Sequence, residues 1–410
     1  MSERIRIAVT GLGIICALGR DRHRFWSNAV EGRGGIGPVD LFDTSGCKAA
    51  IAGQVREEPD PERTRRGRVR RASRTDRFCM TAAVEAVEQA GLAGGGSSSL
   101  ERFGISLGSS TSGMPEAERW VREGIERGFG RQRASRVLRL PSSAPADAVA
   151  EMLGAGGPRL SNMTACTSSA LSIGQAADLI RSAETPGMIA GGGDTLCLMT
   201  YAGFNALRLL DPKPCRPFDA TRQGLSLGEG AGVMVLERWE HAVDRGAQPL
   251  AEFLDYGATC DAHHMTAPHP DGRGASAAMA DALARSGLDA GQIGHINAHG
   301  TGTDLNDSTE ARAIRAVFGT DGVKRIPITA SKSLFGHGLG GSGGLEAVVL
   351  VLSLIHQMAP PTLGWESREA GAPALDIVAG APRRLSCTYG MSNSFGFGGA
   401  NCSLIFRTAP

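Results

Sequence analysis

Short apolar runs bounded by glycine alternate with helix-like segments along the chain, and this alternation constrains the fold more than any other feature of the sequence. Apolar runs of about four to eight residues are typical of buried strands, and apolar residues at helical spacing indicate helices. The alternation occurs in residues 1–249 and again in residues 250–410, with a similar order of elements but no clear sequence repeat. We therefore expect two halves, and strands that alternate with helices predict a layered α/β fold.

The first expected strand runs into the motif Gly11-Leu12-Gly13, which we interpret as a glycine turn. A GxG motif after a strand also occurs in dinucleotide sites. Here Cys16 stands at the third glycine position and no acidic residue follows at the usual distance, so we do not expect a nucleotide.

Residues 112–145 are polar and partly helical, with Trp120 and Val121 as apolar anchors. The expected strands are 4–10, 103–108, 187–193, 233–236, 250–256, 293–298, 326–330, 388–391 and 402–406, and the expected helices are 75–90, 166–183, 275–287, 309–318 and 343–357.

The charges of the chain are nearly balanced, with 43 lysine and arginine residues against 42 aspartate and glutamate residues. This balance favours neither a nucleic acid nor a membrane as partner. The nine cysteines form no CxxC pair and no metal-ligand spacing, so we expect reduced thiols, no metal and a cytoplasmic protein. The start of the chain lacks the apolar core of a signal peptide, and no run of 18 apolar residues occurs.

The segment 62–77 is the local exception, because it contains eight arginines. A segment of this kind is either an ordinary solvated surface or a docking site for an acidic protein or a phosphate. The sequence around it does not decide between the two.

Cys166 lies in the stretch NMTACTSSAL, at the first turn of the helix expected over 166–183. Unpaired N–H groups and the positive end of the helix dipole favour a thiolate at this place, and a lowered pKa makes a cysteine nucleophilic. The alternative is that Cys166 is a small apolar residue of the core. For a single cysteine this alternative is the more common case, so the nucleophile hypothesis depends on residues further along the chain.

Four polar clusters in the second half support the nucleophile hypothesis. They lie at expected strand ends and glycine loops, where the sites of α/β proteins usually form. Each cluster alone is compatible with an ordinary turn, but together they supply two histidines, a lysine and a glycine-rich loop. The clusters are NAHGTGT at 297–303 followed by Asn306, Asp307 and Glu310, SKSLFGHG at 331–338, SNSFGFGGAN at 392–401, and the weaker DAHHMT at 261–266.

These motifs together resemble the β-ketoacyl-[acyl-carrier-protein] synthases, closest to the elongating, KAS II-like branch of the thiolase superfamily. The resemblance extends from TGLG near the start to NSFGFGGANCSLIF at the end. It implies a thiolase-like αβαβα five-layered fold of two pseudo-equivalent halves with mixed five-stranded sheets, and an obligate dimer. It also implies decarboxylative Claisen condensation of a cysteine-bound acyl chain with malonyl-ACP. No cofactor is expected, because phosphopantetheine arrives on the acyl carrier protein.

The resemblance also implies roles for single residues. Cys166 takes the acyl group, and His299 and His337, as neutral imidazoles, donate N–H groups to the enolate oxygen. Lys332 is an electrostatic support close to Glu310 or Glu346, and the backbone N–H groups of Cys166 and Phe397 form the oxyanion hole. The remaining expected residues are Thr301, Thr303 and Thr266 for phosphopantetheine, Phe204 and Phe397 as channel and gating aromatics, and Arg70, Arg74 and Arg208 for docking of the carrier protein.

Three residues depart from the family pattern. Gln223 stands where an aspartate is usual, which puts the salt links of the 217–224 turn in doubt. Phe335 replaces a smaller residue before Gly336-His337, so its bulk is expected to reshape the approach to the site. Thr111 stands where an isoleucine often closes part of the acyl pocket, so a longer or stiffer chain is expected to fit.

Several functions remain open at this point. The chain is either a condensing enzyme of fatty acid synthesis or the catalytic ketosynthase subunit of a type II polyketide or polyene system, paired with a chain-length-factor-like sister subunit. The partner in the dimer is accordingly a second copy or a sister chain. A non-catalytic chain-length subunit is disfavoured by the joint presence of Cys166, His299, His337 and Lys332. A cysteine hydrolase needs neither a second histidine nor a glycine gate.

Overall fold

The structure is a computed structural model that describes residues 5–57, 72–93, 100–132 and 134–409. Five strands of the first half form a mixed sheet in the order β1-β7-β6-β4-β5. In this sheet β1/β7 and β7/β6 are antiparallel, and β6/β4 and β4/β5 are parallel. The strands are β1 (Ile7–Cys16), β4 (Gly104–Gly108), β5 (Arg159–Asn162), β6 (Gly187–Asp194) and β7 (Gly230–Arg238).

The second half repeats this arrangement in the order β8-β14-β13-β9-β10. Its pairings are again antiparallel, antiparallel, parallel and parallel. The two sheets join where β1 pairs antiparallel with β8 at Ile7, Ala8 and Val9. The two pseudo-equivalent halves and their mixed five-stranded sheets are therefore confirmed, whereas the boundary at residues 249 and 250 stays a prediction. The strands are β8 (Ala251–Cys260), β9 (Ile293–Asn297), β10 (Ile328–Thr329), β13 (Tyr389–Phe395) and β14 (Ala400–Thr408).

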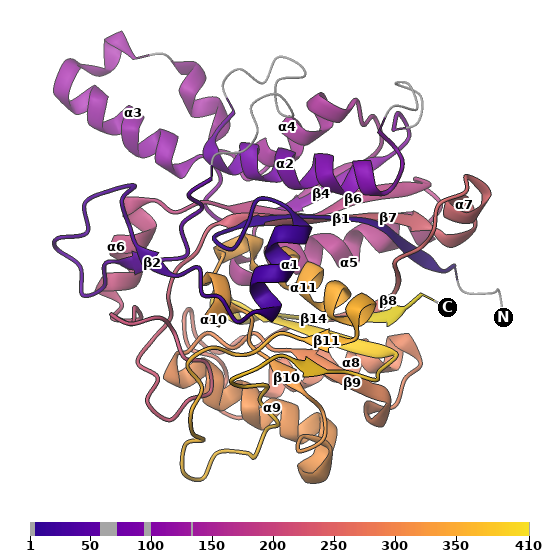
Figure 1. The fold of residues 1–410 in the computed structure, drawn as a ribbon. Coiled ribbons are helices and arrows are strands. Elements are labelled where there is room, and N and C mark those ends of the chain that lie inside the picture. The colour runs from indigo at the N-terminus through magenta and orange to yellow at the C-terminus, as the bar shows by residue number, and fades with distance from the viewer. Residues whose placement is uncertain (1–4, 58–71, 94–99, 133, 410) are drawn as a thin grey trace.

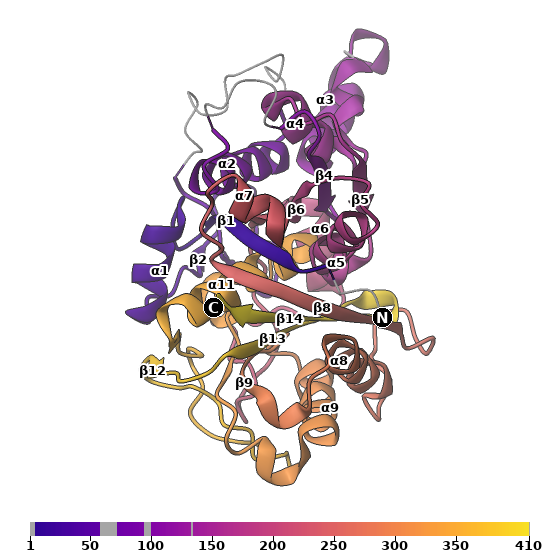
Figure 2. The same ribbon diagram turned by 90° about the vertical axis from the view of Figure 1, so that its right-hand side faces the viewer.

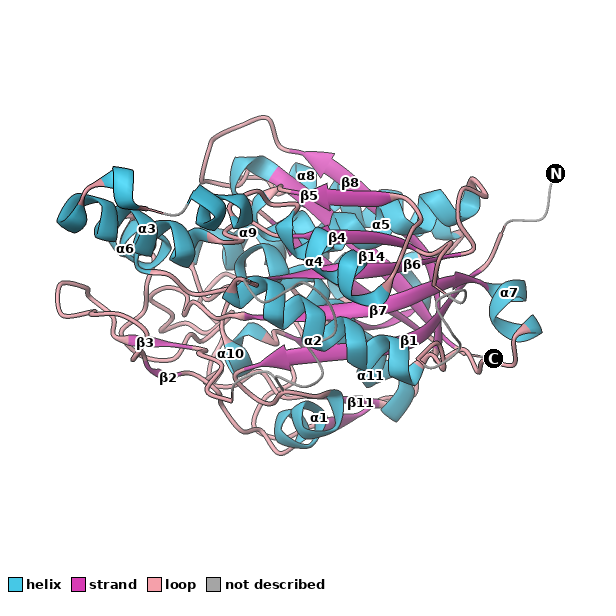
Figure 3. Cartoon of the chain, turned by 90° about the horizontal axis from the view of Figure 1, so that it is seen from above, coloured by secondary structure: helices cyan, strands magenta, loops and turns pink. Residues whose placement is uncertain are grey.

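Helices and sheets alternate in five layers (Figure 1). Seen from above, α2 and α4 cover the outer face of the first sheet (Figure 3), and α8 and α9 lie together on the opposite outer face of the molecule (Figure 2). The middle layer contains α5 and α11, whose apolar side chains share one core with both sheets. The bounds are α2 (Arg74–Gln89), α4 (Ala144–Leu153), α5 (Ser168–Arg181), α8 (Arg273–Ser286), α9 (Asp304–Gly322) and α11 (Ser342–His356).

The expected turn at Gly11-Leu12-Gly13 is wrong, because β1 continues through both glycines to Cys16. The reason is the close approach of α2 to the strand. A Cβ atom at Gly11 would lie 1.9 Å from the carbonyl oxygen of Ala86, and one at Gly13 would lie 1.8 Å from that of Ala82. The glycines therefore allow a helix backbone to rest on the sheet.

The middle helix α11 carries apolar residues on all sides, as expected for a helix that is buried between two sheets. Residues 339–356 have a mean hydropathy of 1.6 and reach the length of a membrane span, but 89% of this stretch is buried inside the fold. We therefore interpret it as a core helix. The nine cysteines are all free, which agrees with the expected reduced thiols.

The remaining elements lie around the layers. The helix α3 (Met114–Arg127) confirms the partly helical reading of residues 112–145, but Val121 is exposed and does not anchor it. Trp120 packs on Phe129 instead, with ring centroids 5.2 Å apart. The other elements are α1 (Arg22–Val30), α6 (Leu198–Ala206), α7 (Trp239–Asp244), α10 (Lys332–Phe335), β2 (Gly37–Pro38), β3 (Ile51–Ala52), β11 (Met358–Ala359) and β12 (Arg383–Arg384).

Candidate active site

The two middle helices begin side by side, and this contact brings the candidate residues together. A Cβ atom at Gly343 of α11 would lie 2.7 Å from Cβ of Ala170 of α5. Each helix follows a short 3-10 turn, Ala165–Thr167 before α5 and Leu339–Gly341 before α11. The first residues of the two turns have nearly the same positive φ, 52° and 53°. The two turns are therefore pseudo-equivalent, and Gly340 corresponds to Cys166.

Cys166, His299 and His337 converge on one cavity of about 240 Å³. The cysteine sulfur and one ring nitrogen of each histidine all lie within 4.8 Å of one another, and all three side chains are buried. The two rings are perpendicular, with centroids 5.5 Å apart. The first half thus supplies the sulfur and the second half supplies both imidazoles. The three atoms are also of the type that binds metal ions, but the nearby Lys332 ammonium opposes a cation there.

The hydrogen bonds of the two rings define their tautomers. The backbone N–H of Leu339 donates to Nδ1 of His337 at 2.9 Å, and the hydroxyl of Ser342 lies 3.1 Å from the same atom. The ammonium of Lys332 lies 3.0 Å from Nδ1 of His299. An Nδ1 atom that accepts a hydrogen bond carries no proton, so each neutral ring carries its proton on Nε2.

The rings are held neutral by their surroundings. Burial lowers the pKa of both His299 and His337 well below the usual value, and the charge of Lys332 lowers both further. Each ring is therefore an N–H donor that carries no charge at neutral pH. This is the state that the sequence analysis expected.

Lys332 is paired with Glu346 and not with Glu310. Its ammonium donates to Glu346 Oε1 and, at 2.6 Å, to the carbonyl oxygen of His299. Glu310 instead accepts the backbone N–H groups of His299 and Gly300, both at 2.8 Å. Burial raises the pKa of each of the two carboxyl groups to about 7. Both carboxylates thus fix His299, one through Lys332 and one through the backbone.

The expected low pKa of Cys166 is not found. Burial raises the pKa of its thiol to about 11, although the charge of Lys332 and hydrogen bonds from the backbone oppose this rise. The residue lies in the 3-10 turn before α5 and not in the first turn of the helix. The cost of placing an anion in a desolvated site therefore outweighs the attraction of the helix end.

The backbone of Phe397 and that of Cys166 itself lower the pKa of the Cys166 thiol, against the larger effect of burial. Their expected role as donors to the oxyanion of the acyl group stays a prediction. The ring of Phe397 stacks on that of Phe204 in α6, with centroids 5.7 Å apart and an angle of 18°. The loop that carries Phe397 passes close to Cys166, because a Cβ atom at Gly396 would lie 3.1 Å from the Cys166 nitrogen. The two aromatic rings thus cover one side of the cavity.

Most of the other expected binding residues line the same cavity. Thr301 and Thr303 lie together, with their hydroxyl oxygens 2.8 Å apart. Arg208 is exposed and has a positive φ of 58°. The expected residues on the wall are Thr266, Thr301, Thr303, Phe204, Arg208, Phe397 and, among the departures, Gln223.

Thr111 and Phe335 do not line this cavity. The hydroxyl of Thr111 donates to Asp194 Oδ1 at 2.8 Å, so the side chain belongs to a buried polar network. Phe335 is buried against Phe25, with ring centroids 6.1 Å apart. Neither side chain therefore belongs to the wall of the cavity that holds Cys166, and their expected effects on the acyl pocket stay predictions.

Arg74 is not available to a carrier protein. Its guanidinium donates to Glu229 at 3.0 and 2.6 Å and to the carbonyl oxygen of Val55 at 2.7 Å. Its side chain is only 14% exposed, and Glu229 is fully buried. Arg70 lies outside the described residues. Arg208 is therefore the one of the three expected docking arginines that the structure describes on the surface.

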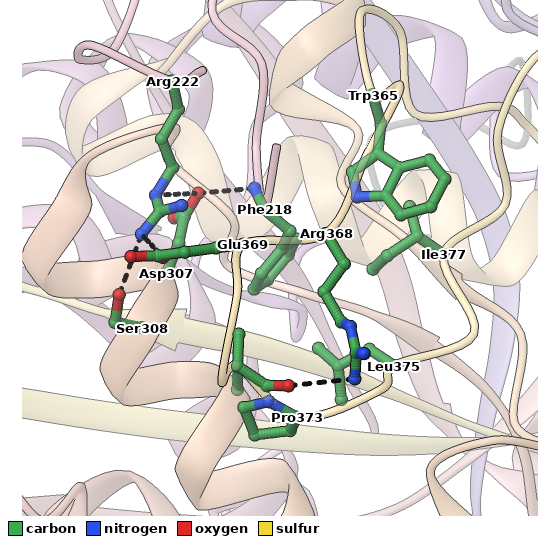
Figure 4. A pocket seen from close by; sticks show the side chains of 12 residues that line it. Phe218, Arg222, Asp307, Ser308, Trp365, Arg368, Glu369, Pro373, Leu375 and Ile377 are labelled. Atoms are coloured by element: carbon green, nitrogen blue, oxygen red, sulfur yellow. Dashed lines mark hydrogen bonds and ion pairs between the residues drawn. The ribbon is translucent and has the colours of Figure 1, made fainter. Parts of the chain in front are cut away.

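The turn at 217–224 keeps its salt links despite Gln223. The neighbouring Arg222 donates to Asp304 at 2.9 Å, to Ser308 at 2.8 Å and to Glu369 at 2.7 Å. Figure 4 shows this guanidinium beside Asp307, Ser308 and Glu369, at the edge of a small pocket of about 20 Å³. The doubt about this turn is thus resolved, because Arg222 ties it to the start of α9.

Two further contacts at the site were missed in the sequence analysis. Ser342 contributes the second hydrogen bond to His337, and the ring of Phe395 lies 5.9 Å from that of His299. Serine and phenylalanine are common at helix starts and strand ends, so their types alone gave no signal. Their roles depend on the contact between the two halves.

The chain matches two family descriptions, "Beta-ketoacyl synthase, N-terminal domain" over residues 4–242 and "Beta-ketoacyl synthase, C-terminal domain" over residues 250–366. It is 37% identical to 3-oxoacyl-[acyl-carrier-protein] synthase 2 of Synechocystis sp. over 99% of this chain and 98% of that one. It is 35% identical to the protein of the same name from Vibrio cholerae, over 99% of this chain and 100% of that one.

Solved structures of similar shape belong to the same group of proteins. The ishigamide ketosynthase/chain length factor is 32% identical, with a TM-score of 0.94 over the whole of both chains. The ketosynthase ApeO in complex with its chain length factor ApeC from Xenorhabdus doucetiae is 32% identical, with a TM-score of 0.85 over 99% of this chain and 98% of that one. The chain therefore belongs to the β-ketoacyl synthase family, as a ketosynthase and acyltransferase that condenses acyl groups in fatty acid or polyketide elongation.

Proposed function

We propose that Cys166 is the residue that takes the acyl group in this condensation. The sulfur attacks the thioester carbonyl of the acyl carrier, so a new C–S bond forms. The old C–S bond breaks, and the phosphopantetheine thiol leaves with the proton of the Cys166 thiol. The observation that carries this proposal is the sulfur of Cys166 within 4.8 Å of two imidazole nitrogens.

His299 and His337 act on the second substrate, malonyl-carrier. Loss of CO₂ leaves an electron pair that is delocalised as an enolate on the thioester oxygen, and two Nε2–H donors stabilise this charge without giving up their protons. The enolate carbon then attacks the acyl carbonyl, and the Cys166 sulfur leaves and regains a proton from solvent. Lys332 supports this step through His299, whose Nδ1 lies 3.0 Å from its ammonium.

Thr301, Thr303 and Thr266 are proposed to hydrogen-bond the phosphopantetheine arm, because their side chains line the wall of the cavity that also holds Cys166. Arg208 is proposed to contact the acidic carrier at the mouth, because it is exposed and lines the same cavity. The chemistry needs no resident cofactor, since the arm arrives on the substrate. The cytoplasmic location stays a prediction.

Intact-mass analysis tests the first step. The full chain is mixed with an acyl-carrier thioester, and the acyl mass is expected on Cys166, with no acylation of Cys166→Ala. Cys260→Ala is the matched control, because Cys260 is an exposed thiol that does not line the cavity. Acylation that persists in Cys166→Ala and disappears in Cys260→Ala would overturn the assignment.

The second step is tested by CO₂ release from labelled malonyl-carrier. His299→Ala and His337→Ala are each expected to lower it by about 10²-fold or more, the typical loss when one donor to a developing oxyanion is removed. CO₂ release at the wild-type rate from either variant would contradict the role of that ring.

We also propose a second subunit of the same fold as partner, either a copy of this chain or a chain-length-factor-like sister. A chain length factor is named with both solved ketosynthases of 32% identity described above. In the described part of the chain, the outer edge of β5 has no strand partner. Large apolar side chains are also exposed on and beside α3 and α6, and such groups of exposed apolar residues are rare on the surface of a monomeric protein. They are Val121, Ile125, Phe129, Leu138, Met199 and Leu207.

Light scattering of the purified chain tests the partner. A dimer that becomes monomeric in Ile125→Glu supports a homodimer through this face. A monomer that associates only with a co-expressed sister chain supports the heterodimer, and with it the type II polyketide reading. A monomer that binds neither would contradict the proposal.

A further inference from the structure

Asp194, the last residue of β6, is a buried carboxylate that the sequence analysis did not single out. It has no exposed surface, and it forms no ion pair with any described residue. Six hydrogen bonds converge on its two oxygens. Oδ1 accepts from Ser109 Oγ (2.6 Å), Thr111 N (2.9 Å), Thr111 Oγ1 (2.8 Å) and Ser112 N (3.1 Å), and Oδ2 accepts from Ser110 N (2.8 Å) and Gly340 N (2.7 Å).

The six donors come from two segments that are far apart in sequence. Five belong to residues 109–112, in the loop after β4, and the sixth is the N–H of Gly340 in the turn before α11. Gly340 is the counterpart of Cys166 in the second half, as the matching φ values of the two turns indicate. The N–H of Gly340, equivalent to that of Cys166, is thus taken up by Asp194.

The same turn fixes the tautomer of His337. Gly340 follows Leu339, whose N–H donates to His337 Nδ1 at 2.9 Å. Two successive N–H groups of one turn are thus held, the first by the imidazole and the second by the carboxylate. Without Asp194, the turn would lose the one side-chain acceptor that the described structure gives to Gly340 N.

A second link leads from Asp194 to the nucleophile. Asp194 accepts the N–H of Ser110, and the hydroxyl of Ser110 donates to the carbonyl oxygen of Ala165 at 3.1 Å. Ala165 directly precedes Cys166 and has a φ of 52°, which is unfavourable for a residue other than glycine. Hydrogen bonds therefore connect the Asp194 carboxylate to two turns, the turn at 165–167 that contains Cys166 and the turn at 339–341 that binds His337.

We propose that Asp194 is a positioning residue that sets the geometry of His337 relative to Cys166, and this inference rests on the function proposed above. A carboxylate is required because four of the six donors are backbone N–H groups, which only donate. An asparagine would place its NH₂ group, which is itself a donor, against N–H donors at one of the two oxygen positions. Asp194 does not contact the reacting atoms, and it acts through the two turns.

The test compares Asp194→Asn with Ser109→Ala. Ser109→Ala removes two buried hydrogen bonds, the one from Ser109 Oγ to Asp194 Oδ1 and the one that Ser109 Oγ accepts from Ser112 N. It leaves the contacts of Oδ2, Gly340 and His337 in place, so it reports the cost of a merely structural change. Three quantities are measured in the full chain: the melting temperature, CO₂ release from malonyl-carrier, and the ¹⁵N signals of the His337 ring. Asp194→Asn is expected to lower CO₂ release by on the order of 10²-fold, as a small misplacement of a catalytic group does. It is also expected to shift the His337 Nδ1 signal away from that of a hydrogen-bonded acceptor.

Ser109→Ala is expected to change the melting temperature while both other readouts stay at wild-type values. Wild-type CO₂ release and His337 signals in Asp194→Asn would overturn the inference. If wild-type protein itself releases no CO₂, the proposed function is wrong instead, so the two failures are distinguishable. If Asp194→Asn does not fold, Gly340→Ala carries the test, because its Cβ atom would lie 2.8 Å from Asp194 Oδ2 and strain the same contact. Unchanged CO₂ release in Gly340→Ala would equally overturn the inference.

Discussion

Lys332 reaches His299 twice, through Nδ1 at 3.0 Å and through the carbonyl oxygen at 2.6 Å. Because the same ammonium donates to the buried Glu346, one cation orients an imidazole and neutralises a carboxylate at once. The orientation of the ring and the stability of the core are therefore coupled at this lysine.

Lys332→Met should lower the free energy of unfolding by about 3 kcal/mol at pH 8, because it leaves the Glu346 carboxylate buried without its cation. Urea denaturation measures this loss. The double variant Lys332→Met/Glu346→Gln is the control, and it should recover most of the stability because the uncompensated charge is gone. A single variant as stable as the double one would contradict the coupling.

Cys166 should react with iodoacetamide faster as the pH rises from 7 to 9.5, without reaching a plateau. Its thiol has a pKa of about 11, raised by burial, and the thiolate is the reactive form. Peptide mass spectrometry measures the rate at Cys166 separately from the exposed Cys260. A plateau below pH 8 would instead support the lowered pKa that was expected from the helix position.

His295 should make the protein less stable in acid. Burial lowers the pKa of this ring to about 4 from 6.5, and the ring lies 2.9 Å from the carbonyl oxygen of Pro327. Between pH 6.5 and 4 the unfolded chain binds a proton that the folded protein excludes, so the free energy of unfolding falls as the pH falls, by about 3 kcal/mol in total.

The variant His295→Asn isolates this effect, because its amide N–H still reaches a carbonyl acceptor but does not titrate. Urea denaturation at pH 7 and at pH 4.5 should show a steeper loss for wild type than for the variant. The comparison cancels the contributions of other buried groups, including Glu310 and Glu346. If wild type and the variant lose the same free energy of unfolding, the folded protein takes up the proton of His295 as readily as the unfolded chain does.

Arg208→Glu should weaken the binding of carrier protein, and the loss should shrink as salt is added, because exposed charges are screened. Arg325→Glu is the matched control, since it makes the same charge change at an exposed arginine that does not line the cavity. Affinity is measured at two salt concentrations. Equal effects of the two variants would indicate a general charge effect and no docking at Arg208.

The alternation of elements and the motif spacing predicted the layered fold and the residues that meet at the site. Strands and helices carry their own periodicities, so α2 and α5 were found within a few residues. The error at Gly11 and Gly13 has a different origin, because glycine is common in turns and the close approach of α2 is visible only in three dimensions.

Electrostatic properties were predicted less well than positions. The pKa of Cys166 depends on desolvation by both halves of the fold, which no local pattern records. Arg74 belonged to a run of arginines that suggested a surface, yet it pairs with the buried Glu229, 155 residues later. Asp194 escaped notice because its partners come from two segments that join only after folding.

The seam between β1 and β8 consists of only three paired positions, Ile7 with Phe253, Ala8 with Glu252 and Val9 with Ala251. The thiol comes from one side of this seam and both imidazoles come from the other. Either half on its own would hold only part of the Cys166, His299 and His337 cluster, however well it folded. A variant that weakened this short seam would therefore separate the sulfur from the imidazoles without altering any of the three side chains.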